Sequence, residues 1–278
     1  MTQTTLFDEA TNDEATNSDK KRSCPLCGGG GQVVLEKLSL EDWRIVNCDA
    51  CNFVYLANPV SYEALVHEHA WERNSVKEDD RRSKDRPTLD NIGKATRFRL
   101  GLFRKDKSKL FLDIFKQGRI VDVGCGSGIS LPRPLQPYGI EISRDLAKHA
   151  DEAMKKRGGR CIHASAIEGL KECEDEYFDG VLLRSFLEHE TNPLVLLQEA
   201  HRVLKSSGVT YVRVPNYASL NRLLMGQKWC GFRYPDHVNY FTPSTLAEMC
   251  RKSGFKMKLL NPLTIWTDDN IKAVLSKA

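Results

Sequence analysis

Two groups of residues in this 278-residue chain have types and spacing that could support chemistry. The first is Ile-Val-Asp-Val-Gly-Cys-Gly-Ser-Gly at residues 120–128, followed by Tyr-Gly-Ile-Glu at residues 138–141. Glycines let bare backbone approach a ligand closely, and a carboxylate that ends the next strand can accept hydrogen bonds from ribose hydroxyls. The dinucleotide fingerprint G-x-G-x-x-G requires glycine where Ile129 stands, so this glycine turn (residues 124–128) predicts a different nucleoside-like ligand.

The second group consists of two matched cysteine motifs, formed by Cys24, Cys27, Cys48 and Cys51. Each C-x2-C pair supplies two neighbouring corners of a tetrahedron, so the array suits zinc, whereas a single C-x-x-C would favour redox chemistry. Gly28 and Asn52 follow the two pairs, and both residue types tolerate the left-handed backbone of such a turn. Since all four ligands are cysteines, we expect a structural zinc ribbon.

Composition and length restrict the class of protein. The chain is long enough for one α/β domain with a small appendage, and its hydrophobic content is 41% with a net charge of +4. No apolar run approaches the length of a membrane span. The polar N-terminus lacks the apolar core of a signal peptide, so we expect a disordered leader, a cytoplasmic protein and cysteines outside disulfides. The expected divisions are a leader (1–22), the zinc ribbon (23–57), a helical linker or lid (58–117) and a catalytic domain (118–278).

From Arg119 onward, predicted strands alternate with helices, which is typical of a parallel sheet covered on both faces. The first strand should end at Val123, with a helix from residue 127 or 128. Residues 268–278 look helical, which would leave a seventh strand short or missing. Further strands are expected at 137–141, 160–164, 178–183, 209–214 and 255–260, and helices after Ser143, at 193–204 and at 243–254.

Several segments resemble the class I S-adenosylmethionine (SAM) dependent methyltransferases. The pattern D-x-G-x-G-x-G at residues 122–128 resembles their motif I, and Phe-Leu-Glu-His at 186–189 resembles the segment after their fourth strand. The resemblance covers residues 119–260. It implies a Rossmann-like α/β sheet with helices on both faces, SAM as cofactor and methyl transfer as the activity.

The same resemblance implies roles for individual residues. The glycine turn would face the methionine part of SAM, Glu141 would bind the ribose, and Asp122 would either hold the turn or organise a water near the ligand ammonium. Relatives often place an acidic residue beside adenine where this chain has His-Ala-Ser-Ala at 163–166. The expected cofactor-binding residues are Asp122, Gly124, Gly126, Gly128, Glu141, Ser165, Ala166 and Arg184.

Two histidines are candidates for acceptor chemistry. His189 follows the fourth strand, and His237 lies in an aromatic-rich insertion (residues 229–242), which we call the cap. Histidine can accept a proton near neutral pH. For each residue we weigh a general-base role against a structural one, in which His237 would staple its loop by hydrogen bonds.

The resemblance favours a SAM-dependent methyltransferase with a small-molecule or sugar-like acceptor. Pro-Asp-His-Val-Asn-Tyr-Phe-Thr at 235–242 resembles a segment of bacterial methyltransferases associated with cell-surface glycans and deoxysugars. One alternative is an rRNA or tRNA methyltransferase that grips RNA through the ribbon and the basic stretch 97–109, which otherwise reads as a helix covering the sheet. Another is a non-catalytic SAM-binding or interaction module.

Overall fold

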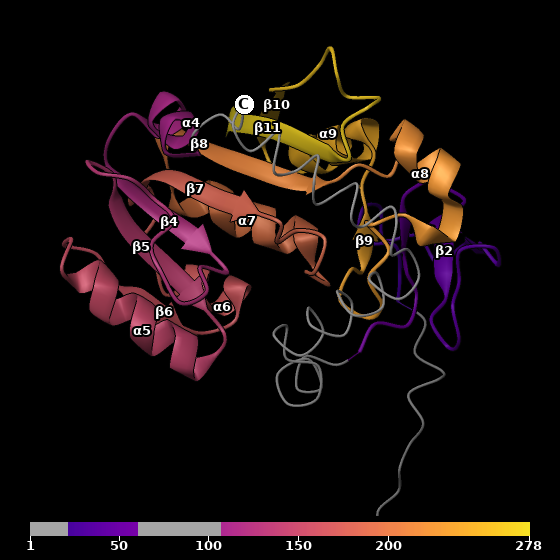
Figure 1. Cartoon of the computed structure of the whole chain (residues 1–278), viewed down its shortest axis with the longest axis horizontal. Coiled ribbons are helices and arrows are strands. Elements are labelled where there is room, and N and C mark those ends of the chain that lie inside the picture. Colours follow the sequence, from indigo (N-terminus) through magenta and orange to yellow (C-terminus); the bar gives the residue numbers. More distant parts are fainter. Residues whose placement is uncertain (1–21, 61–106) are drawn as a thin grey trace, which may run out of the picture.

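The structure is a computed structural model that describes residues 22–60 and 107–278 (Figure 1). The leader at 1–21, most of the expected linker and most of the basic stretch 97–109 lie outside the described residues.

A seven-stranded sheet in the order β10-β11-β8-β7-β4-β5-β6 forms the larger layer (Figure 1). Strands β8, β7, β4, β5 and β6 are mutually parallel, and β11 runs antiparallel to both of its neighbours. The predicted Rossmann-like α/β sheet is therefore confirmed. The strands are β4 (Arg119–Val123), β5 (Gln136–Glu141), β6 (Cys161–His163), β7 (Phe178–Arg184), β8 (Leu204–Pro215), β10 (Phe255–Leu259) and β11 (Asn270–Lys277).

The C-terminal segment corrects one expectation, since residues 268–278 are not helical and the seventh strand is present. In β11 the buried residues Ile271, Ala273 and Leu275 alternate with more exposed ones, and this period of two is that of a strand. The strand lies between β8 and β10 and pairs with both. It is therefore an internal strand of the sheet.

The helix expected from residue 127 or 128 is also absent. Residues 124–135 form turns and loop, and β5 begins at Gln136. Pro132 and Pro134 lack a backbone N–H and clash with a preceding helical turn, so this short connection cannot form a helix.

Helices cover both faces of the sheet. Phe111 and Phe115 of α4 pack with Ile120 and Leu182 on one face, where α5 also lies and Met154 approaches Gly139. Three helices share a second apolar cluster on the opposite face. The helices are α4 (Lys107–Phe115) and α5 (Arg144–Lys155) on the first face, and α6 (Ala166–Lys171), α7 (Pro193–Val203) and α9 (Pro243–Lys252) on the second.

The ribbon is a small sheet that the cap completes. Its strands are β1 (Gln32–Val34), β2 (Ile45–Cys48) and β3 (Val54–Leu56), and β9 (Asn239–Tyr240) of the cap pairs with β3. The cap follows α8 (Leu220–Met225) and the 3-10 turn η1 (Gly226–Lys228). In Figure 1, β2, β9 and α8 lie together at the end of the molecule away from α5 and β6.

The cap aromatics pack inward rather than lining an open cleft. Trp229, Phe232 and Tyr240 are at most 1% exposed, and they share an apolar cluster with Ile45 and Leu56 of the ribbon. Burying such side chains stabilises the junction between ribbon and cap.

Candidate functional site

The glycine turn has the backbone that its sequence predicts. Gly124 and Gly126 adopt φ values of 71° and 61°, which side chains rarely tolerate. A Cβ on Gly124 would lie 2.6 Å from the ring of Phe186, whereas one on Gly128 would meet open space. The turn therefore requires its first two glycines, and Phe186 presses directly on it.

Glu141 holds this turn from the end of β5. Its carboxylate accepts hydrogen bonds from the backbone N–H groups of Gly126 and Ser143, both at 2.9 Å. The side chain is buried, at 7% exposure. A carboxylate has about four lone-pair sites, so two remain to accept ribose hydroxyls.

Asp122 is tied to the segment that follows the turn. The Ser130 hydroxyl donates to Asp122 Oδ2 at 2.6 Å, which joins the aspartate to the loop beyond the glycine turn. Burial raises the pKa of Asp122 to about 6, which the Ser130 bond and the charge of Arg184 oppose and the charge of Glu141 reinforces. Arg184 is the last residue of β7, and its charge acts on Asp122.

Ser165 and Ala166 lie beside Glu141, because Glu141 of β5 pairs with His163 of β6. The Ser165 hydroxyl accepts from the backbone N–H of Glu168 at 3.4 Å and caps α6, and Ala166 is the buried first residue of that helix. The hydroxyl expected near adenine thus also serves as a helix cap.

The two candidate histidines come together. Their ring centroids lie 4.7 Å apart at an interplanar angle of 84°. Burial lowers the pKa of His189 to about 4, so its imidazole is neutral at physiological pH. His237 Nδ1 lies 2.7 Å from the carbonyl oxygen of Gly231, which is the loop-stapling contact expected.

Glu188 joins the histidines, and sequence reasoning assigned it no role. It is only 1% exposed, and burial raises its pKa to about 8. Its backbone oxygen accepts from the N–H groups of Val238 and Asn239 at 2.7 and 3.1 Å. The signal in the sequence was an ionisable residue between the apolar Leu187 and a candidate histidine.

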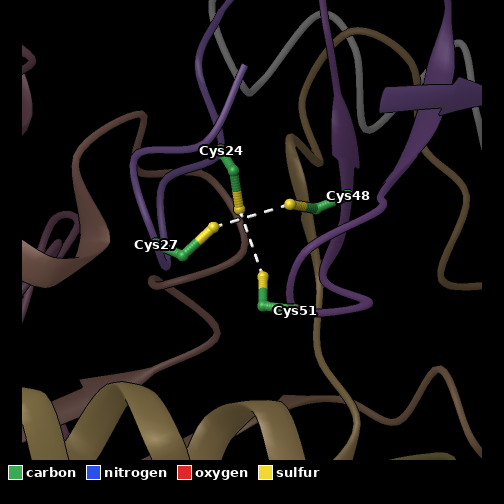
Figure 2. A group of neighbouring side chains, drawn as sticks. All are labelled: Cys24, Cys27, Cys48 and Cys51. Atoms are coloured by element: carbon green, nitrogen blue, oxygen red, sulfur yellow. Dashed lines mark hydrogen bonds between the residues drawn. The ribbon is translucent and has the colours of Figure 1, made fainter. Parts of the chain in front are cut away.

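The four ribbon cysteines converge on one point (Figure 2). The sulfurs of Cys24 and Cys51 lie 3.5 Å apart, as do those of Cys27 and Cys48. Sulfurs bound to tetrahedral zinc at about 2.3 Å lie about 3.8 Å apart, so the cluster has the dimensions of such a site.

The turns after the two cysteine pairs support the same geometry. Gly28 and Asn52 have φ values of 76° and 58°, as their positions predict. The backbone N–H of Gly29 donates to Cys27 Sγ at 3.4 Å. Burial raises the pKa of Cys24 to about 11, and a coordinated cation would offset this by favouring the thiolate.

Arg22, assigned to the leader by sequence reasoning, joins the ribbon to the cap. Its guanidinium donates to the carbonyl oxygen of Val238 at 3.1 Å, to Asn239 Oδ1 at 3.0 Å and to the carbonyl oxygen of Thr191. Burial lowers its pKa to about 10.

Residues 95–260, more than half of the chain, match the family model of a methyltransferase domain. The chain therefore belongs to this methyltransferase family. No helix within the described ranges is both long and apolar enough to cross a lipid bilayer.

The individual proteins that this chain resembles share at most 30% sequence identity with it among those described below. An uncharacterised protein of Methanocaldococcus jannaschii is 30% identical over 50% of this chain and 65% of its own length. A ubiquinone biosynthesis O-methyltransferase of Nitrosomonas europaea is 26% identical over 49% of this chain and 62% of its own. A solved SAM-dependent methyltransferase from Archaeoglobus fulgidus is 20% identical with a TM-score of 0.48, over 62% of this chain and 91% of that one. The matches thus span less than two thirds of the two sequence relatives.

Proposed function

We propose that the chain transfers a methyl group from SAM to a small-molecule acceptor held between the glycine turn and the cap. The contact that carries this proposal is Phe186. Its ring lies against the glycine turn, and its backbone oxygen accepts a hydrogen bond from the His189 N–H at 2.9 Å. The residues proposed to bind SAM, the methyl donor, are therefore neighbours of the residues proposed to act on the acceptor. The residues proposed to bind SAM are Asp122, Gly124, Gly126, Gly128, Glu141, Ser165, Ala166 and Arg184.

The chemistry needs little beyond alignment and removal of a proton. The methyl group moves from the sulfonium of SAM to the acceptor atom, and the acceptor proton passes to a base or to water. His189 is one proposed base, because its imidazole is neutral at physiological pH, and its lowered pKa makes it a weaker proton acceptor than an ordinary histidine. His237 is the alternative, and its Nδ1 contact with Gly231 would fix its ring.

An oxygen acceptor on a small molecule has the support of the relatives named ubiquinone biosynthesis O-methyltransferase. The resemblance of the cap sequence at 235–242 to that of methyltransferases associated with glycans and deoxysugars supports a sugar-like acceptor. We propose that the ribbon holds zinc and has a structural role, because four cysteines leave no open coordination position.

Calorimetric titration with SAM and S-adenosylhomocysteine tests the cofactor site. The zinc-loaded protein should bind with a Kd on the order of micromolar. Glu141→Ala should weaken binding by about tenfold or more, since it removes a buried charged acceptor. Glu152→Ala, on the exposed surface of α5, is the matched control and should bind like the wild type. Absence of binding by the wild type would refute the proposal, whereas binding opens a labelled-methyl screen of nucleotide sugars and hydroxylated aromatics.

A further inference from the structure

Three metal-ligating side chains meet where the cap joins the end of the sheet. Glu188, His189 and His237 each offer one ligand atom, and these atoms lie within 4.8 Å of one another. The first two follow β7, and the third precedes β9 of the cap. Neither the resemblance nor the relatives assign a role to this combination.

Backbone carbonyls orient both imidazoles. His189 Nδ1 lies 2.9 Å from the oxygen of Asp236, and His237 Nδ1 lies 2.7 Å from the oxygen of Gly231. A carbonyl oxygen only accepts, so each Nδ1 carries the proton and each Nε2 presents a lone pair. Metal-ligating histidines are held by such bonds to a backbone carbonyl or a carboxylate.

The carboxylate supplies the independent observation. Glu188 is 1% exposed, and its Oε2 has no hydrogen-bond partner among the described residues. An unsatisfied buried carboxylate is costly, and a cation would offset that cost. Two nearby guanidiniums act on it without direct contact: Arg213 donates to the Ser185 hydroxyl at 2.7 Å, and Arg233 pairs with Asp236 at 3.9 Å.

We propose that Glu188, His189 and His237 form a second metal site, which takes a divalent first-row cation such as Zn²⁺. Two imidazole nitrogens and a carboxylate oxygen suit such ions. Ligands about 2.1 Å from a tetrahedral centre lie about 3.4 Å apart, so binding would draw the three side chains together by about an ångström.

This site differs from the cysteine cluster because three protein ligands leave a coordination position open. It also lies next to the proposed SAM-binding residues, because Phe186 contacts both the glycine turn and the backbone of His189. With both imidazoles coordinated, neither would act as the general base; the open position would instead bind the acceptor oxygen and favour loss of its proton to water, a role that rests on the proposed methyl transfer. Metal binding itself does not depend on that function.

Zinc titration of the full chain, already loaded with one equivalent of Zn²⁺ at the ribbon, tests the site. Calorimetry should show one further Zn²⁺ per chain. Glu188→Gln and His237→Gln should each weaken this second event by at least about tenfold. His149→Gln is the matched control, because the ring of this exposed histidine also faces a carbonyl oxygen, that of Asp145, and the second event should persist.

The proposal fails if the wild type takes up only one zinc, or if the second event survives in both ligand variants. Should those variants not fold, anomalous scattering from zinc-soaked wild-type crystals decides, since a peak between Glu188 and the two histidines is expected and its absence overturns the site. SAM titration of the same protein separates the two proposals: SAM binding without a second zinc removes the metal site alone, and a second zinc without SAM binding removes the proposed function alone.

Discussion

The part of the site proposed to bind the methyl donor SAM (the donor side) and the part proposed to bind the methyl acceptor (the acceptor side) are built in different ways. The donor residues Asp122, the glycine turn and Glu141 come from one continuous stretch. Glu141 accepts a hydrogen bond from Gly126 of the turn, and Asp122 accepts one from Ser130, which follows the turn. The acceptor side combines the segment after β7, the cap and the ribbon, and one of its bonds joins Arg22 to Val238, 216 residues apart. The donor side therefore depends on local contacts, whereas the acceptor side depends on a folded ribbon.

The ribbon stabilises the position of the cap. Strand β9 contributes only Asn239 and Tyr240 to its sheet, and its partner there is β3. A two-residue strand has little stability alone. Loss of the ribbon should therefore release the cap and leave the glycine turn intact.

Removing one ribbon cysteine should have the largest effect. Cys48→Ser deletes a proposed zinc ligand that is fully buried in β2, and structural zinc contributes directly to folding. We expect loss of bound zinc and of methyl transfer, with the SAM affinity unchanged within about threefold. Zinc analysis, SAM calorimetry and a methyl-transfer assay measure these quantities. Cys230→Ser, at an exposed cysteine, is the control, and loss of SAM binding in Cys48→Ser would break the comparison.

Arg22→Met should come next, because it leaves the carbonyl oxygens of Val238 and Thr191 without this donor. We expect the free energy of unfolding to fall by on the order of 2 kcal/mol. Chemical denaturation measures this. Arg44→Met removes an exposed bond to the Glu41 carbonyl oxygen and should cost less than about 0.5 kcal/mol. An equal loss of unfolding free energy in the two variants would show that Arg22 does not stabilise the cap.

On the donor side, Gly124→Ala should lower stability by about 1–3 kcal/mol, since it combines a positive φ with a clash against Phe186. Gly128→Ala is the matched control, because its backbone is ordinary and its Cβ would enter open space. Thermal unfolding compares the two. A stable Gly124→Ala variant would contradict the close packing of the turn.

The smallest expected effect is a pH dependence. Burial raises the pKa of Asp122 to about 6 in the folded state, so its contribution to folding stability falls as the pH rises from about 4 to 6. Binding of the SAM ammonium should favour the ionised form, so the SAM affinity should rise by on the order of fivefold as the pH passes through about 6. Calorimetry between pH 5 and 7.5 should show this rise in the wild type and a flatter profile in Asp122→Asn. Equal profiles would remove Asp122 from the cofactor site.

The same contrast explains what sequence could predict. The glycine turn and the cysteine pairs are local patterns, and the left-handed backbone of Gly28 and Asn52 was expected from their positions. The helical reading of residues 268–278 was wrong because β11 depends on pairing with β8, far away in sequence.

Long-range contacts also account for the residues that sequence reasoning missed. Nothing local places Arg22 against the cap, and nothing local closes the cap onto β3. Glu188 gained significance only when the fold brought His237 beside it.

Amide hydrogen exchange of the zinc-loaded and the chelator-treated protein tests the central contrast most directly. Without zinc, the amides of β3 and β9 should lose protection, while those of β4 and β5 keep it. Continued protection of β9 in the zinc-free protein would contradict the dependence of the cap on the folded ribbon. Simultaneous loss of protection in β4 and β5 would contradict the independence of the donor side.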